Sequence, residues 1–498
     1  MASKKQINYG ERIANGLFWT YGERITAQGI SLIVSIILAR LLSPAEYGII
    51  SIVMIFITLC NTFVTGGFGN SLIQKRDSDD LDFSTIFYCS LFLSIFLYIA
   101  LFFSAPFIGR FYNNALLVPV IRILGLRIPI SGINSIQQAR IAKKMAFKRF
   151  FFATLTGTLI SAIVGITMAY KGMGVWALVA QYLTNSTIDT IVLFATEKWF
   201  PKWMFSWQRA KTLLAFGWKV LFTNLVYTLE GDIRSLIIGK VFGASDLAFY
   251  DQGKKYPNVI VANINTSISK VMFPAFSQNQ DDLSSMKRMN RRAVQIDAFL
   301  LSPLLVGLIA TADTFVSCLL TEKWLPCVPY LRILSIVFLV KPLATICQQS
   351  ILAVGKSGIT LKIEVVQNIL AIVLLCISVF GFSSVPMIAW SNVITEIVGL
   401  AMFMFYVNKL IGYTIREQLL DLIPSLGSSI IMGISVWSMH FVDLSFVLLL
   451  LLQVLTGVVI YCLISCIIKN KALIYLLSLL SNKTKSVALE KILKVVDR

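Results

Sequence analysis

Apolar segments of about 20 residues recur along the whole chain, and each is long enough to cross the hydrocarbon core of a bilayer as an α-helix. A helix also satisfies its backbone hydrogen bonds internally, as a segment inside lipid must. The chain is 57% hydrophobic and 14% charged, and its mean hydropathy is +0.78. The sequence therefore predicts an all-α polytopic membrane protein.

We predict fourteen transmembrane helices from hydropathy and segment length. They cover residues 14–40, 45–67, 83–105, 117–138, 150–170, 174–196, 212–239, 247–276, 293–312, 325–353, 359–380, 384–408, 420–440 and 444–468. The start, MASKKQINYGER, has basic residues but no short apolar core followed by a cleavage site. We therefore expect the first helix to be retained rather than removed as a signal peptide.

The distribution of positive charge predicts the orientation of these helices. With the N-terminus in the cytoplasm, the inward segments contain 28 lysines and arginines and the outward loops contain five. Positive residues accumulate on the cytoplasmic side of membrane proteins, so both termini are expected there. The net charge of +19 thus reflects membrane topology, and with no soluble domain present we expect no nucleic-acid partner.

Composition also argues against an enzyme or a metal centre. The eight cysteines are scattered without a paired CxxC array, and the chain has one histidine, His440. Neither pattern is typical of a metal site or a disulfide framework. The predicted outward loops are short and leave no room for a catalytic domain, so no enzyme activity is expected.

The sequence repeats itself at an offset of about 200 residues. IILARLLSPAEYG at 36–48 resembles LIIGKVFGASDLA at 236–248, and Arg122-Ile123-Leu124 corresponds to Arg332-Ile333-Leu334. This order predicts two parallel six-helix repeats that form N and C lobes around a central cavity, where transporters commonly bind substrate. The predicted divisions are 1–211 (N-lobe), 212–411 (C-lobe), 412–468 (helices 13 and 14) and 469–498 (a basic amphipathic cytoplasmic tail).

Polar stripes run along three of the predicted transmembrane helices. Helix 212–239 has five polar residues within about 80° of arc at 100° per residue: Lys219, Thr223, Tyr227, Glu230 and Arg234. Helix 14–40 places Arg24 and Gln28 on one face, and helix 247–276 does so with Asp251 and Lys255. Charges inside a membrane usually face protein or water, so the stripes predict a wet, net-cationic cavity.

A cationic cavity favours an anionic cargo, because guanidinium and ammonium groups bind phosphate oxygens. The neutral polar residues suit sugar hydroxyls, so a phosphate-linked carbohydrate is a reasonable cargo. The alternative is that Glu230–Arg234 and Asp251–Lys255 are internal pairs that hold helices together. Further intramembrane residues leave the same two interpretations open, namely a transport role or a structural pair: Arg127, Lys341, Asp189, Asp297, Glu364 and Glu396.

Four stretches resemble a known family. They are GLFWTYGERITAQGISLIVSIILARLLSPAEYGIISIVMIF, GGFGNSLIQKRDSDDLDFSTIFY, RILGLRIPISGINSIQQARIAKKMAFKRF and GKVFGASDLAFYDQGKKYPN. The chain resembles the polysaccharide exporters of the multidrug/oligosaccharidyl-lipid/polysaccharide (MOP) superfamily over roughly residues 10–410. More narrowly, it is similar to the Wzx-type flippases close to the colanic acid and teichuronic acid exporters.

The resemblance implies two lobes around a V-shaped cavity lined by helices 1 and 7. It implies flipping of an undecaprenyl-diphosphate-linked oligosaccharide across the bacterial cytoplasmic (inner) membrane for O-antigen, capsule or exopolysaccharide assembly. Alternating access would be coupled to H⁺ or Na⁺, with no cofactor. Besides the lipid-linked cargo and membrane lipids, a polysaccharide polymerase and chain-length machinery are expected partners.

The family offers no invariant motif to transfer, so the expected binding residues follow from position and repeat symmetry. We expect Arg24 and Lys219 to hold the diphosphate, and Arg234 and Lys255 to extend the positive path. Gln28, Thr223 and Tyr227 would add neutral contacts. Glu230 or Asp251 would exchange partners when a coupling ion binds. The main alternative function is an ion-coupled drug or metabolite antiporter of the same superfamily, whose cavity would more often be acidic.

Overall fold

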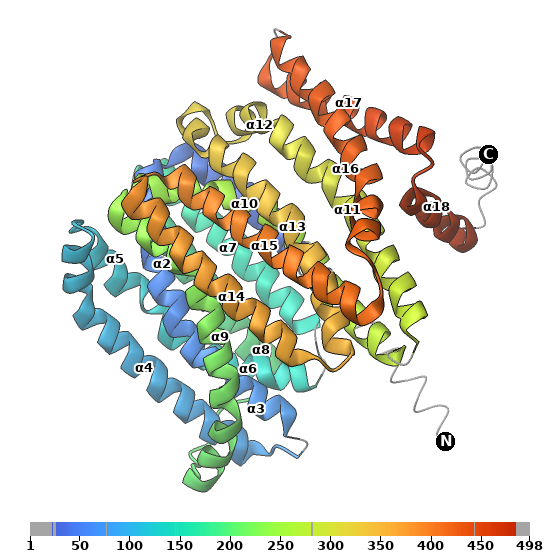
Figure 1. Cartoon of the computed structure of the whole chain (residues 1–498). Helices are drawn as coiled ribbons and strands as arrows, with labels where there is room; N and C mark the ends of the chain where they lie inside the picture. The colour runs from blue at the N-terminus through green and yellow to red at the C-terminus, as the bar shows by residue number, and fades with distance from the viewer. Residues whose placement is uncertain are drawn as a thin grey trace. The chain divides into compact units, whose positions relative to one another are not determined.

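The computed structural model describes residues 22, 26–75, 77–144, 146, 148–279, 282–442 and 444–484. Within these ranges the regular structure is helical, without a β-strand, and eleven helices are long and apolar enough to cross a membrane (Figure 1). The predicted class, an all-α multi-pass membrane protein, is confirmed. The chain divides into two compact units, 1–248 and 249–498.

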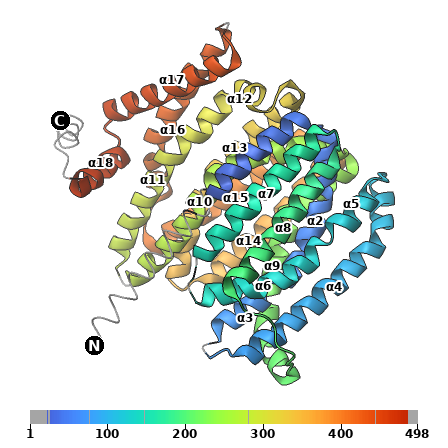
Figure 2. The same ribbon diagram turned by 180° about the vertical axis from the view of Figure 1, so that it is seen from behind.

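Unit 1 is built around α2. Its helices are Thr26–Leu41, α2 (Pro44–Thr65), α3 (Phe68–Gln74), α4 (Asp80–Phe111), α5 (Leu117–Leu124), α6 (Arg127–Lys143), α7 (Lys148–Tyr170), α8 (Val175–Glu197) and α9 (Trp207–Val241). Helix α2 packs against α4, α6 and α9, while α8 packs against both α6 and α7 (Figure 2). Helix α6 thus lies between α2, α4 and α8.

Local capping signals set where the helices of unit 1 begin. Pro44 opens α2, and the Ser43 backbone N–H donates to Glu46 Oε2 at 2.7 Å while Ser43 Oγ accepts from the Glu46 N–H. Asp79 and Asp82 form the same reciprocal capping box at the start of α4. Such boxes satisfy backbone donors that a helix start leaves unpaired.

At two glycines, Gly48 in α2 and Gly67 just before α3, the chain passes very close to the backbone of another segment. A Cβ atom on Gly48 would overlap the carbonyl of Ala244, and one on Gly67 would overlap the carbonyl of Gly217. Glycine is therefore required at both positions for steric reasons. The crossings fix both ends of the α2–α9 contact.

Gly48→Ala is expected to destabilise unit 1 by about 1–3 kcal/mol, because the added methyl group meets rigid backbone. The measurement is the thermal unfolding midpoint of the detergent-purified protein. The matched control is Gly427→Ala in a helix of unit 2, where a Cβ meets nothing within 4 Å. The crossing is not a constraint if both variants unfold at the wild-type temperature.

Unit 2 contains the remaining helices. They are α10 (Ala244–Gln278), whose first residues belong to unit 1, α11 (Leu283–Ala310), α12 (Ala312–Leu319), η1 (Glu322–Cys327), α13 (Val328–Ala353), α14 (Ser357–Cys376), η2 (Ile377–Gly381), α15 (Val385–Ile411), α16 (Ile415–Ser438), η3 (Met439–Phe441), α17 (Phe446–Ile467) and α18 (Lys471–Thr484). Helix α11 packs against α13 and α16, and α15 packs against α13 and α14.

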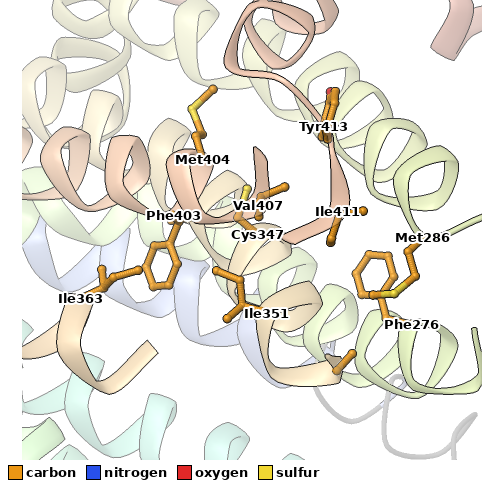
Figure 3. Packing of buried hydrophobic residues seen from close by; sticks show 12 residues of the cluster. Phe276, Met286, Cys347, Ile351, Ile363, Phe403, Met404, Val407, Ile411 and Tyr413 are labelled. Carbon is orange, nitrogen blue, oxygen red and sulfur yellow. The ribbon is translucent and has the colours of Figure 1, made fainter. Parts of the chain in front are cut away.

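An apolar cluster at one end of α13 and α15 joins five helices of unit 2. Figure 3 shows Phe403 beside Ile363, and Phe276 beside Met286, around a centre formed by Cys347, Ile351 and Val407. Tyr413 joins the cluster and donates its hydroxyl to Asp421 Oδ2 at 2.8 Å. This packing holds together the ends of these helices in unit 2.

Two details of the fold agree with the predicted sequence repeat. Helix Thr26–Leu41 ends and α2 begins at Pro44, just as α9 ends at Val241 and α10 begins at Ala244. Arg122 and Arg332 also correspond, since each donates Nε to a backbone carbonyl of the preceding helical segment, Phe102 O at 3.5 Å and Ile309 O at 3.3 Å. The contact-based division nevertheless falls after α9, whereas the predicted lobe boundary precedes it at residue 211, and that boundary stays a prediction.

Helices α8 and α9 correspond to the predicted spans 174–196 and 212–239 but are not among the eleven most apolar helices. Both contain intramembrane polar or charged residues, which lower their hydropathy. The predicted tail begins as α18, which packs on α11 and places Tyr475 4.4 Å from the guanidinium of Arg292. Residues 485–498 lie outside the described residues.

Candidate functional site

The structure describes some of the predicted binding residues. Arg24 and the side chains of Lys219, Tyr227 and Glu230 lie outside what it describes. In unit 1, Gln28 is partly buried, Thr223 is exposed and Arg234 is buried. In unit 2, Asp251 and Lys255 are partly buried on α10. Of the predicted stripe on α9, the structure thus places two side chains, Thr223 and Arg234.

Hydrogen bonds and close packing hold α9 against α2. Thr62 Oγ1 and Thr228 Oγ1 are 3.2 Å apart, and a Cβ on Gly239 would lie 3.2 Å from Ile52 Cγ1. These two contacts show that the helices are antiparallel. Along α9, Arg234 lies between Thr228 and Gly239, the residues that make the contacts. The Arg234 side chain is 9% exposed.

The Arg234 guanidinium is incompletely satisfied. Its Nε has no hydrogen-bond partner, and none of the ion pairs in the described residues includes Arg234. Asp232 is near in sequence but lies about 200° round the helix, on the opposite side. Intramembrane charges are costly and often functional, so Arg234 is a candidate for a functional position.

A second arginine, which is partly buried, lies between α6 and α8. Arg127 Nε donates to Ser186 Oγ at 2.8 Å, and its guanidinium lies 5.6 Å from the centre of the Tyr182 ring. These are neutral partners, and none of the described ion pairs includes Arg127. A hydroxyl and an aromatic face thus hold this guanidinium.

The two arginines lie at similar depth in unit 1. Arg127 Nη1 reaches Met54 Sδ at 3.6 Å, and Met54 is two residues from Ile52 on α2. Arg234 is five residues from Gly239, which packs on Ile52. At a rise of about 1.5 Å per residue, the guanidinium of Arg127 and the backbone of Arg234 lie within roughly one helical turn of each other along α2.

Further polar contacts continue along α6 and α8. Two turns beyond Arg127, Asn134 Nδ2 donates to Asp189 Oδ2 at 2.8 Å. Two turns further, Arg140 Nε donates to Glu197 Oε1 at 2.9 Å. The contacts run parallel to the helix axes from the interior of unit 1 to its cytoplasmic end, as the positive-inside prediction orients it.

The cytoplasmic end of this row is a cluster of ion pairs around Glu197. Its carboxylate is fully buried and pairs with Arg140, Lys144 and Arg149. Three helices, α6, α7 and α8, thus meet on one carboxylate. Burial, and then repulsion by Arg140 and Arg149, lowers the pKa of Lys144.

A neighbouring cluster ties the start of α9 to the start of α4. Arg209 Nη1 lies 2.5 Å from Asp79 Oδ1 and 3.2 Å from Asp82 Oδ1, and Lys75 Nζ lies 2.6 Å from Asp82 Oδ2. The hydrogen bond from Arg209 lowers the pKa of Asp79 to about 2, so this carboxylate stays ionised at physiological pH. A cavity of about 310 Å³ lies beside it, lined in part by Lys75, Gln208 and Thr212.

Charged residues near the helix ends of unit 2 are paired in the same way. Arg291 makes two hydrogen bonds to Asp421, at 2.5 and 3.0 Å, and Lys287 pairs with Glu417 at 2.8 Å. At the other end of unit 2, Arg332 pairs with Asp313. The ion pairs of the described residues thus lie at or within a few turns of helix ends, and they include neither Arg127 nor Arg234.

The structure changes the interpretation of several acids. Asp189 accepts from Asn134, and Glu364 accepts from Gln348 Nε2 at 2.8 Å, which favours structural roles for both. Sequence patterns gave no indication of the role of Glu197, because its three partners are about 50 residues away in the chain. The available signal was the spacing of Arg127 and Asn134, which lie on one face of α6.

This arrangement can bind an anion by electrostatics and hydrogen bonding. Guanidinium groups in a low-dielectric interior bind phosphate oxygens more strongly than they do in water. Among the described residues, no three His, Cys, Asp or Glu side chains are grouped to hold a metal ion. The described charges of Arg127 and Arg234 therefore suit a negatively charged group inside unit 1.

Comparison with known proteins gives consistent results. A profile of the family described as "Polysaccharide biosynthesis protein" matches residues 37–329, more than half of the chain. The lipopolysaccharide biosynthesis protein WzxC of Escherichia coli (strain K12) is 23% identical over 364 residues, covering 73% of this chain and 74% of that protein. The teichuronic acid biosynthesis protein TuaB of Bacillus subtilis (strain 168) is 25% identical over 352 residues, covering 70% and 73%.

Solved structures share the fold at low sequence identity. The lipid II flippase MurJ in an inward closed conformation superposes with a TM-score of 0.72 at 16% identity, covering 91% of this chain and 98% of that one. An inward-facing multidrug resistance MATE transporter of the MOP superfamily has a TM-score of 0.58 at 15% identity, covering 76% and 94%. The chain shares the fold of these two proteins.

Proposed function

Because this chain belongs to the polysaccharide biosynthesis protein family, we propose that it is a Wzx-type flippase. Its cargo is an oligosaccharide joined through a diphosphate to undecaprenol, which it moves from the inner to the outer leaflet of the bacterial cytoplasmic membrane. The product serves O-antigen, capsule or exopolysaccharide assembly. The observation that carries this proposal is a pair of arginines at similar depth in unit 1, the partly buried Arg127 and the buried Arg234, neither of which is in an ion pair within the described part of the chain.

A flippase must move a charged head group through the membrane interior. The diphosphate contributes most of the charge of such a cargo, and moving it unaccompanied through lipid would be prohibitively costly. Guanidinium groups replace the water around its oxygens, while exposed polar residues such as Thr223 can bind sugar hydroxyls. The undecaprenyl chain stays in the bilayer. No covalent bond changes, so the protein works as a transporter and not as an enzyme.

The proposal keeps the finer features expected from the sequence. The chain crosses the membrane fourteen times with both termini in the cytoplasm, and its two six-helix repeats alternate access to a central cavity. Arg24 and Lys219 contribute to the cationic path together with Arg234 and Lys255. A polysaccharide polymerase receives the flipped unit on the outer side.

The test is the leaflet distribution of lipid-linked oligosaccharide in the cells that make this protein. Deletion of the gene should cause the lipid-linked oligosaccharide to accumulate in the inner leaflet, and re-expression of the wild-type chain should clear it. An unchanged pool in the deletion strain would contradict the proposal. Export of a small molecule, assayed with the same strains, would then be the function to examine.

A further inference from the structure

Asp297 of α11 is an intramembrane carboxylate without a hydrogen-bond donor at one of its oxygens. The residue is 4% exposed, and its buried Oδ1 atom has no hydrogen-bond partner. Among the other acids singled out from the sequence, Asp189 and Glu364 accept side-chain hydrogen bonds. Buried polar atoms in folded proteins are nearly always paired, so an unpaired carboxylate oxygen requires an explanation.

The nearest polar groups along these helices also have unsatisfied acceptors. Packing of Val261 on Leu301 and of Ile268 near Val294 places Asn265 of α10 at the level of Asp297. The Oδ1 atom of Asn265 is buried without a hydrogen-bond partner. Two acceptor oxygens at this level thus lack a donor, and protonation of Asp297 would add an O–H donor there.

A polar path leads from this position towards the cytoplasmic end of α11. Asn290 lies two helical turns from Asp297 on the same face, is fully buried, and has no partner for either its Oδ1 or its Nδ2 atom. Asn290 lies seven residues beyond Leu283, where α11 begins. Buried groups with free hydrogen-bonding capacity at this spacing suit a chain of water molecules that conducts a proton.

No charged group on the neighbouring helices is paired with Asp297 in the described structure. On α13, Lys341 lies near the same level and is partly buried, and none of the described ion pairs includes it. On α16, Asp421 is bound by Arg291, on a different face of α11. Glu396 of α15 has interactions of its own.

The helix α10 contains four charged residues before Asn265, namely Asp246, Asp251, Lys254 and Lys255, and all of them lie well away from Asp297. Asp251, Lys254 and Lys255 precede Asn265 by ten or more residues, about 15 Å along the helix, and have interactions of their own. The side chain of Lys270 lies outside the described side chains. The tyrosine hydroxyl nearest to α11 from α17, that of Tyr461, donates to Phe299 O at 2.9 Å.

We propose that Asp297 is a proton-binding site in unit 2 that couples flipping to the proton gradient. A proton from the outer aqueous phase binds one carboxylate oxygen, and the resulting O–H donates to a neighbouring acceptor. The proton leaves by way of Asn290 to the cytoplasm in the other facing state, and no other bond changes. The coupling role rests on the proposed flippase function, but proton binding itself does not.

The test is infrared difference spectroscopy of the reconstituted protein between acidic and alkaline buffer. The C=O band of a protonated carboxyl group should titrate in the wild type and be lost in Asp297→Asn. Asp313→Asn, which removes a carboxylate paired with Arg332, is the matched control and should retain the band. Asp297→Glu should retain a band at a shifted frequency, which covers the case in which Asp297→Asn fails to fold.

Two results would overturn the proposal. One is a titrating band that is unchanged in Asp297→Asn. The other is a carboxylate signal that responds at constant pH to sodium chloride in place of choline chloride in the wild type but not in Asp297→Asn, because the site would then bind Na⁺. For coupling, a pH gradient should accelerate flipping by the wild type and leave Asp297→Asn unaffected. If the wild type does not flip lipid at all, the proposed function fails while the infrared result still decides proton binding.

Discussion

Glu197→Gln is expected to lower the free energy of unfolding by about 3 kcal/mol, the largest stability effect of a single side chain proposed here. The substitution removes the fully buried carboxylate that Arg140, Lys144 and Arg149 share. Three cations are then left to repel one another at the junction of α6, α7 and α8. The expected loss is at the low end for buried ion pairs, because the side chains of Lys144 and Arg149 are 48% and 36% exposed and partly screened by solvent.

The measurement is chemical or thermal unfolding of the purified protein in detergent. Glu322→Gln is the matched control, since Glu322 is exposed and none of the described ion pairs includes it. Adding Lys144→Gln to Glu197→Gln should recover part of the stability by removing one repelling cation. Equal unfolding midpoints for Glu197→Gln and Glu322→Gln would show that the cluster does not hold the three helices together.

Arg127→Gln and Arg234→Gln are each expected to reduce lipid flipping by about 10- to 100-fold, the largest functional effects proposed here. A charge-assisted hydrogen bond to phosphate contributes about 1.5–3 kcal/mol, and tenfold corresponds to about 1.4 kcal/mol. Glutamine keeps similar length and polarity but removes the positive charge. Lysine at either position should restore part of the rate, because it restores the charge without the two-pronged geometry.

The readout is the rate of flipping at matched protein level, together with the accumulation of lipid-linked oligosaccharide in the inner leaflet. Arg122→Gln serves as the control, because Arg122 lies near a helix end against Phe102 and is not expected to reach the cargo. Wild-type rates for both Arg127→Gln and Arg234→Gln would remove these two residues from the binding site. The flippase function itself would remain.

The helical fold could be predicted from hydropathy alone, because each span must be a long apolar helix whatever it packs against. The spans with polar residues were harder to predict from hydropathy. The helices α8 and α9 nevertheless form where the sequence predicted them, because each keeps a long apolar face. The two arginines that the sequence repeat aligns, Arg122 and Arg332, each donate Nε to a backbone carbonyl, while the division into two six-helix repeats stays a prediction.

The partners of intramembrane charges could not be predicted in the same way. Arg127 is held by Ser186, and Asn134 by Asp189, across more than 50 residues of sequence. Helical periodicity tells which side chains share a face but not which neighbouring helix covers that face. For the same reason Asp189 appeared isolated in the sequence although it has a partner in the fold.

The two described side chains of the predicted cationic stripe differ in exposure. Arg234 is buried, which fits a site within protein, while Thr223 is exposed. The proposed contributions of Arg24, Lys219, Tyr227 and Glu230 stay predictions, because these side chains lie outside the described residues. Arg127 is added to the candidate binding residues because its described partners, Ser186 and Tyr182, are neutral and leave its charge available to a cargo phosphate.

The measurement that tests the central claim most directly is flipping by the purified protein in liposomes. The liposomes contain undecaprenyl-diphosphate-linked oligosaccharide in a defined leaflet, and a membrane-impermeant glycosidase reports how much reaches the other side. The account predicts that the wild-type protein accelerates this transfer over empty liposomes and that Arg127→Gln and Arg234→Gln slow it. Equal transfer rates with and without the wild-type protein would contradict the account.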